Sequence, residues 1–431
     1  MRVRLPYGRS DFDLTLKGEW DLLLPDDPRP VHDPRQALLQ SLEAPIGSPS
    51  LETLIRAKRN VTIIVSDCTR PTGASIFVPP LLEFLNATGI PDQNIRILFS
   101  LGIHGPQTPA QQQEILGPAV TSRCLAVDHD CKSADGNSYV GTTRGGIRVF
   151  LNRTAVDSEF VLATGSIGFH YLAGFSGGRK SIVPGISSYE TCASWHRLSL
   201  DADGHRHPKA RTAILLGNPL HEESADATRF LPPAFLINTV LTRSREIAGF
   251  FSGDLLRAHQ AGCDRYEKGH VVDIDDQREA VIVACGGSPR DLNFIQAHKA
   301  IEHSCGAVKK GGVVIAVAEC PQGLGSPSFL AWFDHPSRTS MAEHLQEHFD
   351  INGQTALSLR TKAESFEILL LSKLSPEAVI KMGMKPIETL GDGIRILEER
   401  FGKNVHGWVI PDAVSLLPRI GGPGGAHFPA S

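Results

Sequence analysis

The stretch GSIGFHYLAGFSGGRKSIVPGISSYETCASWH, residues 165–196, is the most informative segment of this chain. It follows residues 160–163, a short apolar run that is typical of a buried strand. The segment then presents His170, a glycine-rich loop that ends at Lys180, and finally His196. Ligands of open α/β sheets bind beyond the carboxyl ends of the strands. The order of these residues therefore indicates a ligand site.

The loop before Lys180 contains three glycines, which allow the backbone to approach a cofactor or a phosphate closely. They are Gly174, Gly177 and Gly178. A Walker A loop requires glycine directly before its lysine, whereas Arg179 stands there. The Rossmann glycine spacing is also missing, as is the acidic residue at the next strand end. The loop therefore matches neither nucleotide-binding motif.

Further short apolar runs alternate with helical stretches along the chain, and this alternation predicts an α/β fold with mostly parallel sheets flanked by helices. The runs are residues 61–65, 95–99, 281–285 and 313–317. One helix is expected over about 76–88, a second after Ser187, where Glu190 completes a capping-box pattern, and a third after Asp291.

A chain of 431 residues is too long for one ordinary core, so we expect two domains. The polar stretch 263–279 precedes a new strand and places the boundary near residue 275. The first domain is then 1–275, and it is expected to bind the cofactor. The second is 276–403, another α/β domain.

The charge balance excludes several classes of partner. The chain has 43 basic and 47 acidic side chains, a formal net charge of −4, and no long run of either sign. Nucleic acids and membrane surfaces are therefore not expected as partners. The first thirty residues contain no apolar stretch long enough for a signal peptide or a membrane span, so we expect a cytoplasmic protein. The eight cysteines form no C-x-x-C pair that would suggest zinc or redox chemistry.

Two more polar motifs follow predicted strands. Asp67, Thr69 and Arg70 come after 61–65, and a guanidinium there could hold a carboxylate or phosphate with two hydrogen bonds. The alternative is an Asp–Arg surface pair in a turn. His104 lies between glycines after 95–99, where it is either catalytic or simply hydrogen-bonded in its loop.

A third motif belongs to the helix predicted after Asp291. Gln296 and Lys299 are three residues apart, which puts both side chains on one helix face near its start. The free N–H groups of that end favour an anion. The alternative is that Lys299 is merely solvated, as most helical lysines are.

Together, S-D-C-T-R-P, L-G-I-H-G, F-H-Y-x-x-G-F-S-G-G-R-K-S-I-x-P-G and D-L-N-x-x-Q-x-x-K resemble the nickel-dependent lactate racemase family over most of the chain. The resemblance implies two domains that close over an active site in the cleft between them, with residues from about 404 to 431 returning to the first. It also implies a nickel-pincer nucleotide, a pyridinium mononucleotide with two thiocarbonyl arms, made and loaded with nickel by partner enzymes.

The resemblance also implies a role for each matching residue. Lys180 would carry the cofactor covalently and His196 would complete a square-planar nickel, a geometry that suits sulfur and imidazole ligands. His104 and His170 would be the paired acid and base. The other implied roles are substrate binding by Arg70, Gln296 and Lys299, and cofactor binding by Asp67, Thr69, Gly177 and Gly178.

The implied activity is racemisation at C2 of a small 2-hydroxyacid by reversible hydride transfer through a 2-ketoacid. Two histidines are needed because the two enantiomers present their hydroxyls on opposite sides. Family members commonly have tyrosine before the glutamine, but Ile295 stands here. A more apolar pocket is therefore expected, which favours short aliphatic substrates such as lactate or 2-hydroxybutyrate over malate or a sugar acid.

Two other functions compete with this interpretation. A metal-dependent hydrolase would need several histidines around one open metal position; the candidates are His196, His205, His207 and His221. That function would leave Lys180 and the glycine loop without a role. A ligand-binding protein without catalytic activity is the third possibility.

Overall fold

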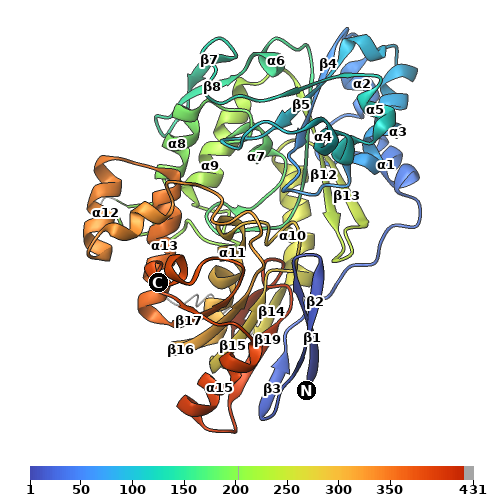
Figure 1. Ribbon diagram of the computed structural model, residues 1–431. Coiled ribbons are helices and arrows are strands. Elements are labelled where there is room, and N and C mark those ends of the chain that lie inside the picture. Colours follow the sequence, from blue (N-terminus) through green and yellow to red (C-terminus); the bar gives the residue numbers. More distant parts are fainter. Residues whose placement is uncertain (202, 422–431) are drawn as a thin grey trace. The chain divides into compact units, whose positions relative to one another are not determined.

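The computed structural model describes residues 1–201 and 203–421 (Figure 1). The chain forms two compact units. Unit 2 comprises Asp27–Ser199 and Pro208–Lys268, and unit 1 comprises Met1–Asp26, Leu200–His207 and the residues from Gly269 onward. The chain therefore passes between the units four times.

Unit 2 is built on a six-stranded sheet with the order β13-β12-β9-β4-β5-β6. All neighbours are parallel except β13, which runs antiparallel to β12. The strands are β4 (Val61–Ser66), β5 (Ile95–Ser100), β6 (Leu125–Asp128), β9 (Val161–Ser166), β12 (Ala234–Leu241) and β13 (Ile247–Gly253).

Both faces of this sheet are covered, which is why all six positions of β4 are buried apolar or hydroxyl residues. Ile63 packs into the core beneath α1 (Pro34–Glu43), α2 (Leu51–Ile55) and α3 (Ala74–Ala87), while its neighbour Ile64 packs into the core on the opposite face. The remaining helices of the unit are α4 (Pro109–Leu116), α5 (Pro118–Thr121), α6 (Arg153–Val156), α7 (Arg179–Ile182), α8 (Tyr189–Arg197), α9 (Pro219–Ala227) and α10 (Arg257–His270), whose last two residues belong to unit 1.

Unit 1 has a second six-stranded sheet, of order β18-β17-β16-β15-β19-β3, in which every pair is parallel. Its strands are β3 (Glu19–Leu22), β15 (Arg278–Ala284), β16 (Val308–Val317), β17 (Glu367–Leu371), β18 (Lys385–Pro386) and β19 (His406–Ile410). One face packs against α11 (Phe294–Ser304), α12 (Arg338–Glu347) and α13 (Ile351–Ser365). Helix α14 (Pro376–Lys381) contributes Val379 to the same core.

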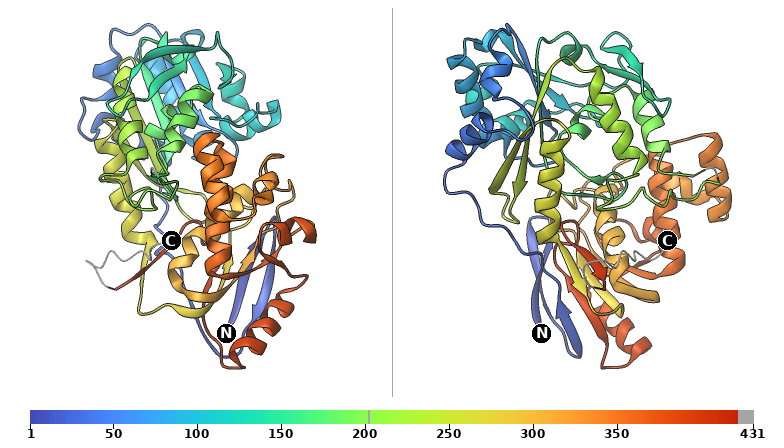
Figure 2. Two further views of the ribbon diagram at one scale, coloured as in Figure 1. Left: turned by 90° about the vertical axis from the view of Figure 1, so that its left-hand side faces the viewer. Right: turned by 180° about the vertical axis from the view of Figure 1, so that it is seen from behind.

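The other face of the unit 1 sheet is covered by the N-terminal hairpin and by α15 (Leu390–Phe401) (Figure 2). The hairpin consists of β1 (Arg2–Tyr7) and β2 (Ser10–Thr15) and buries Leu5 against strand residues such as Ile282. Three small sheets complete the fold: β7 (Asn137–Thr142) with β8 (Arg148–Asn152), β10 (Phe169–His170) with β11 (Gly174–Phe175), and β14 (Val271–Ile274) with β20 (Leu417–Ile420).

The α/β class with two mostly parallel sheets, predicted from the sequence, is confirmed. The cap of α8 differs from the prediction: it is Ser188, whose hydroxyl accepts from the N–H of Thr191, whereas Ser187 lies outside the helix. The hydroxyl of Ser187 instead donates to the carbonyl oxygen of Pro184.

The two units divide the chain differently from our predicted domains. Residues 1–26 were assigned to the first domain, but β3 pairs with β19, so they complete the sheet of unit 1. The segment from 404 was expected to return to the first domain, yet β19 and β20 also belong to unit 1. Residues 422–431 of that segment lie outside the described residues. In the described part of the chain, no helix has the length and apolar character needed to span a bilayer.

Candidate active site

Three strands of unit 2 bring the sequence motifs of that unit to one edge of its sheet. Strands β9, β4 and β5 are consecutive neighbours and parallel, so the loops after them begin on the same side. These loops carry Asp67 to Arg70, His104, and the segment from His170 to Lys180. The sheet topology, and not proximity in sequence, therefore groups these residues.

Asp67 is the centre of a polar cluster after β4 and is only 3 % exposed. Its carboxylate accepts from the guanidinium of Arg70 and from both the hydroxyl and the N–H of Thr69. The Nδ1 atom of His104 lies 2.9 Å from the same carboxylate. Burial by itself raises the pKa of Asp67, but the charge of Arg70 and the bond from His104 bring it below its usual range. Asp67 is therefore an anion that orients the side chains of Arg70 and His104.

The bond to Asp67 fixes the tautomer of His104. A carboxylate only accepts, so Nδ1 of His104 carries the proton and Nε2 has the lone pair. The side chain is 34 % exposed, so that lone pair is available to a substrate. A histidine held by a buried carboxylate is the usual arrangement of a general base.

The glycine loop folds tightly onto the sheet. A Cβ on Gly178 would lie 1.8 Å from the side chain of Leu236, and one on Gly174, whose φ is +78°, would lie 2.2 Å from the carbonyl oxygen of Ile214. A Cβ on Gly177 would similarly meet Ile167. Packing against the protein thus already accounts for these glycines.

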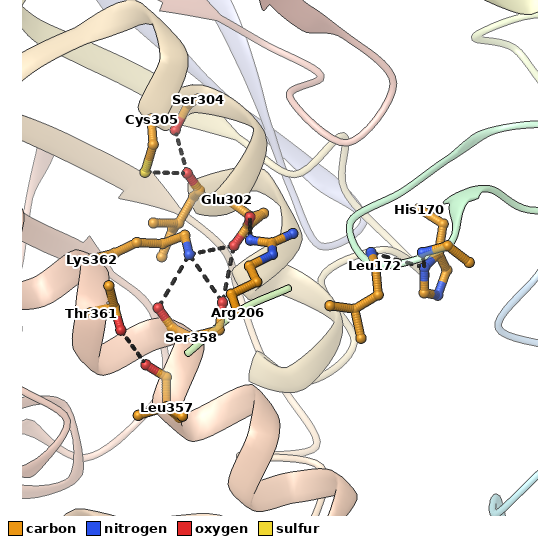
Figure 3. A network of polar contacts seen from close by, with 12 residues as sticks. His170, Leu172, Arg206, Glu302, Ser304, Cys305, Leu357, Ser358, Thr361 and Lys362 are labelled. Atoms are coloured by element: carbon orange, nitrogen blue, oxygen red, sulfur yellow. Dashed lines mark hydrogen bonds and ion pairs between the residues drawn. The ribbon is translucent and has the colours of Figure 1, made fainter. Parts of the chain in front are cut away.

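The loop brings His170 and Lys180 into contact. The Nζ atom of Lys180 lies 3.1 Å from Nε2 of His170 and 4.4 Å from the ring centre of Trp195. The other ring nitrogen of His170, Nδ1, accepts from the N–H groups of Leu172 and Ala173 at 3.2 and 3.1 Å (Figure 3). His170 is therefore held on both sides.

His196 lies in the last turn of α8, next to Trp195. Its Nδ1 is 2.8 Å from the carbonyl oxygen of Cys192, so this nitrogen carries the proton and Nε2 has the lone pair. Burial lowers the pKa of His196 to about 3. A neutral imidazole whose second nitrogen donates to a carbonyl is the form that binds a metal.

Unit 1 holds the other two predicted substrate residues. Gln296 and Lys299 both lie on α11, and the Lys299 ammonium donates to the Gln296 side-chain oxygen at 2.6 Å. Ile295, which stands where family members have tyrosine, is partly buried against the core of unit 1.

A buried cluster around Arg179, the residue before Lys180, was not predicted from the sequence. Arg179 is fully buried, donates to Nδ1 of His221 at 2.7 Å and to the carbonyl of Ala173 at 3.2 Å, and lies 2.9 Å from Nε2 of His259. Within the described part of the chain, no carboxylate forms an ion pair with it. The one signal in the sequence that could have indicated this cluster was the charged residue Arg179 inside a glycine loop that folds onto buried strands.

The chain does not itself provide a complete metal site in the residues described. Among them, no three His, Cys, Asp or Glu side chains form a group that could hold a metal ion. His221, one of the four histidines proposed for a hydrolase, is instead bonded to Arg179. A single imidazole such as His196 suits a metal that arrives with its own donors.

Comparison with known proteins shows which family the chain belongs to. Sequence models of the lactate racemase N-terminal domain and C-terminal domain match residues 7–207 and 274–417. The chain is 31% identical to the lactate racemase of Thermoanaerobacterium thermosaccharolyticum over 97% of its own length and 99% of the relative. This chain belongs to the lactate racemase family. It is also 32% identical to the lactate racemase of Lactiplantibacillus plantarum, over 89% of this chain and 90% of that protein.

Solved structures support membership in the lactate racemase family. The lactate racemase apoprotein of T. thermosaccharolyticum superposes with a TM-score of 0.86 at 30% identity, covering 97% of this chain and all of that one. A Thermotoga maritima protein with 19% identity and a TM-score of 0.69 covers 93% of this chain and 100% of its own, and shares the fold.

Proposed function

We propose that this protein inverts the C2 stereocentre of a short-chain aliphatic 2-hydroxyacid such as lactate or 2-hydroxybutyrate. The observation that carries the proposal is the pairing of an oriented histidine, His104 on Asp67, with a second histidine in contact with Lys180 at the neighbouring strand end. The membership in the lactate racemase family, together with the relatives named lactate racemase, gives the reaction class.

The residues present fit a nickel-pincer nucleotide. Lys180 would hold it covalently through its amine, and His196 would bind the nickel through Nε2, since Nδ1 is already used by the Cys192 carbonyl. When bound, the cofactor supplies an acceptor for the hydride of C2, which avoids a carbanion next to a carboxylate. Enzymes that make this cofactor and insert nickel are then required partners.

The chain's own residues bind the substrate and move its hydroxyl proton. His104 takes this proton through Nε2, and the buried Asp67 stabilises the imidazolium that forms. Arg70, whose guanidinium is half exposed, binds the substrate carboxylate while Asp67 keeps it in place. His170 serves the opposite enantiomer, and Gln296 and Lys299 contact the substrate oxygens.

The test is to produce the protein together with the cofactor-making enzymes. We expect nickel, an added mass of several hundred daltons on the Lys180 peptide, and interconversion of the lactate enantiomers in chiral chromatography. His104→Ala and His170→Ala should keep the adduct but lose about two to four orders of magnitude in turnover. Exposed His32→Ala is the matched control. An active preparation with unmodified Lys180 would contradict the proposal.

A further inference from the structure

Two loops of unit 2 meet where Asp67 contacts His104. Asp67 directly follows β4, whereas His104 lies four residues beyond the end of β5. The two strands pair as far as Ser66 and Ser100. Beyond that pair, no bond between backbone groups joins the two loops in the described part of the chain. Side chains therefore hold His104 at 2.9 Å from the Asp67 carboxylate, the contact that fixes its tautomer.

Gln107 makes a second contact between these loops, three residues after His104. Its side-chain oxygen Oε1 accepts from the backbone N–H of Cys68 at 2.8 Å. Cys68 is the residue after Asp67, so this bond joins the loops directly beside the carboxylate that His104 uses. Gln111 adds a weaker contact, because its amide nitrogen lies 3.4 Å from the Cys68 sulfur.

The backbone of Gln107 is held from a third strand. Asp128 is the last residue of β6, and its carboxylate accepts from the Gln107 N–H at 2.8 Å. The same carboxylate accepts from the side-chain amide of Gln112 at 3.2 Å. Helix α4 begins two residues after Gln107, where Thr108 and Gln111 form a capping box. Gln107 therefore reaches toward Cys68 from a base that a strand and a helix start both fix.

The partner of Gln107 determines how its amide is oriented. A backbone N–H only donates, so the atom that faces Cys68 is the oxygen. The amide nitrogen Nε2 is then buried, and it has no hydrogen-bond partner among the described residues. Buried polar groups without a partner are uncommon. The position therefore uses the acceptor of the amide, and the donor is dispensable there.

We propose that Gln107 is a positioning residue for proton transfer, because its bond to Cys68 keeps Asp67 in contact with His104. The inference rests on the proposed function, in which His104 takes the substrate hydroxyl proton through Nε2. Gln107 acts through the loop after β4 and not on the reacting atoms. A displacement of about 1 Å at a catalytic group can lower the rate about a hundredfold.

The apoprotein allows a test that does not depend on the cofactor. When the histidine rings carry a heavy nitrogen isotope, NMR shows which ring nitrogen is protonated, and the His104 signals are assigned by their loss in His104→Ala. The spectra are recorded at about pH 9, where an ordinary imidazole is neutral. We expect the proton on Nδ1 in the unsubstituted protein. Gln107→Met, similar in size but without the acceptor, should give a mixture of both tautomers.

Three further variants separate the acceptor from other properties of the side chain. Gln107→Glu should keep the His104 tautomer, because a carboxyl group has an acceptor oxygen in either protonation state. Gln113→Met, at an exposed glutamine of α4, is the matched control and should leave the tautomer unchanged. Asp128→Ala removes the anchor of Gln107 and should also give a mixture. It provides the same test if Gln107→Met does not fold.

Turnover of the loaded enzyme tests whether Gln107 acts through Asp67. Gln107→Met should lower kcat for lactate about 10- to 100-fold. In the Asp67→Asn background the same substitution should change kcat by less than about twofold, because the tautomer that Gln107 supports is already lost. Fully additive losses of kcat would overturn the inference. An unchanged His104 tautomer in both Gln107→Met and Asp128→Ala would also overturn it.

Failure of this inference and failure of the proposed function give different results. A tautomer mixture in Gln107→Met, together with a loaded protein that racemises no 2-hydroxyacid, would contradict the function and leave the link between Gln107 and His104 standing. An unchanged tautomer in an active racemase would contradict the inference alone.

Discussion

Glu302 in α11 places its carboxylate between the ammonium of Lys362 in α13 and the guanidinium of Arg206 (Figure 3). All three side chains are at most 15 % exposed. Ser358 adds its hydroxyl, which bonds to both Glu302 and Lys362. Arg206 belongs to the short segment Leu200–His207, so this network attaches that segment to the helices of unit 1.

Glu302→Gln should lower the free energy of unfolding of unit 1 by about 3–5 kcal/mol, because two buried cations lose their counter-charge. Urea unfolding followed by tryptophan fluorescence reports mainly on unit 1, which contains three of the four tryptophans: Trp20, Trp332 and Trp408. Glu399→Gln breaks an exposed pair with Arg395 and should change the free energy by less than about 1 kcal/mol. Equal effects of the two variants would contradict the assigned role of Glu302.

The protein should lose stability as the pH falls below about 6.5. Burial is the first cause that lowers the pKa of six histidines, so the folded state binds fewer protons than the unfolded state below the ordinary value of 6.5. They are His129, His196, His221, His259, His298 and His303. Each contributes a slope of up to about 1.4 kcal/mol per pH unit.

Thermal unfolding midpoints between pH 4.5 and 8 measure this dependence. The midpoint should be nearly constant above pH 7 and fall steeply between 6.5 and 5. His298→Gln should reduce the steepness, whereas replacement of exposed His348 should not. A midpoint that is flat down to pH 5 would show that these histidines are not held neutral.

Arg179→Gln should raise the pKa of His221, which is now lowered to about 3 by burial first and by the Arg179 charge second. The substitution removes the cation but can still donate to one imidazole. Imidazole NMR signals followed between pH 3 and 8 give the midpoint, and we expect an increase of at least one unit. Arg229→Gln, which breaks an ion pair with Asp226, is the control. An unchanged midpoint would show that burial alone lowers the pKa of His221.

Asp67→Asn should reduce racemisation by roughly two to four orders of magnitude. The amide can donate to Nδ1 of His104 and so favour the tautomer without a lone pair on Nε2, and it removes the ion pair with Arg70. Turnover of each lactate enantiomer is the measurement. Asp92→Asn, in the Asp92–Arg123 pair, should retain normal turnover. Normal turnover of the Asp67→Asn variant would contradict the proposal that Asp67 orients His104 for catalysis.

Ile295→Tyr should shift substrate preference from 2-hydroxybutyrate toward lactate. In the proposed substrate pocket Ile295 would form an apolar wall, where each extra buried methylene of a substrate would contribute up to about 0.8 kcal/mol. A panel of single enantiomers of lactate, 2-hydroxybutyrate, malate and gluconate, analysed by chiral chromatography, provides the ratio of kcat/KM values. Preference of the unsubstituted protein for malate or gluconate would contradict the aliphatic assignment.

The sequence predicts elements whose causes are local. Strands such as β4 and β5 were found because continuous apolar runs are typical of strands covered on both faces. The loops after them could be recognised because a polar motif follows each run directly. The cap of α8 was misplaced by one residue, since Ser187 has Glu190 three residues later and matches the capping-box pattern, whereas the actual cap, Ser188, has Thr191 at that position.

Features that depend on distant pairing could not be predicted from the sequence. The partners of Arg179 are 42 and 80 residues away, at His221 and His259. Likewise nothing in residues 1–26 shows that β3 joins a strand near the other end of the chain. The short segment 200–207, which includes Arg206, contains no composition change that reveals its membership in unit 1.

The pairing of β3 with β19 has a consequence for synthesis on the ribosome. Strand β3 ends at Leu22 and is translated long before its neighbour β19, which ends at Ile410. Unit 2 is complete at Lys268, and a further 142 residues separate it from Ile410 (410 − 268). At 5–20 residues per second this takes on the order of ten to thirty seconds. During that time the apolar side chains of the N-terminal hairpin, including Leu5, must remain exposed or be covered by a chaperone until their sheet exists.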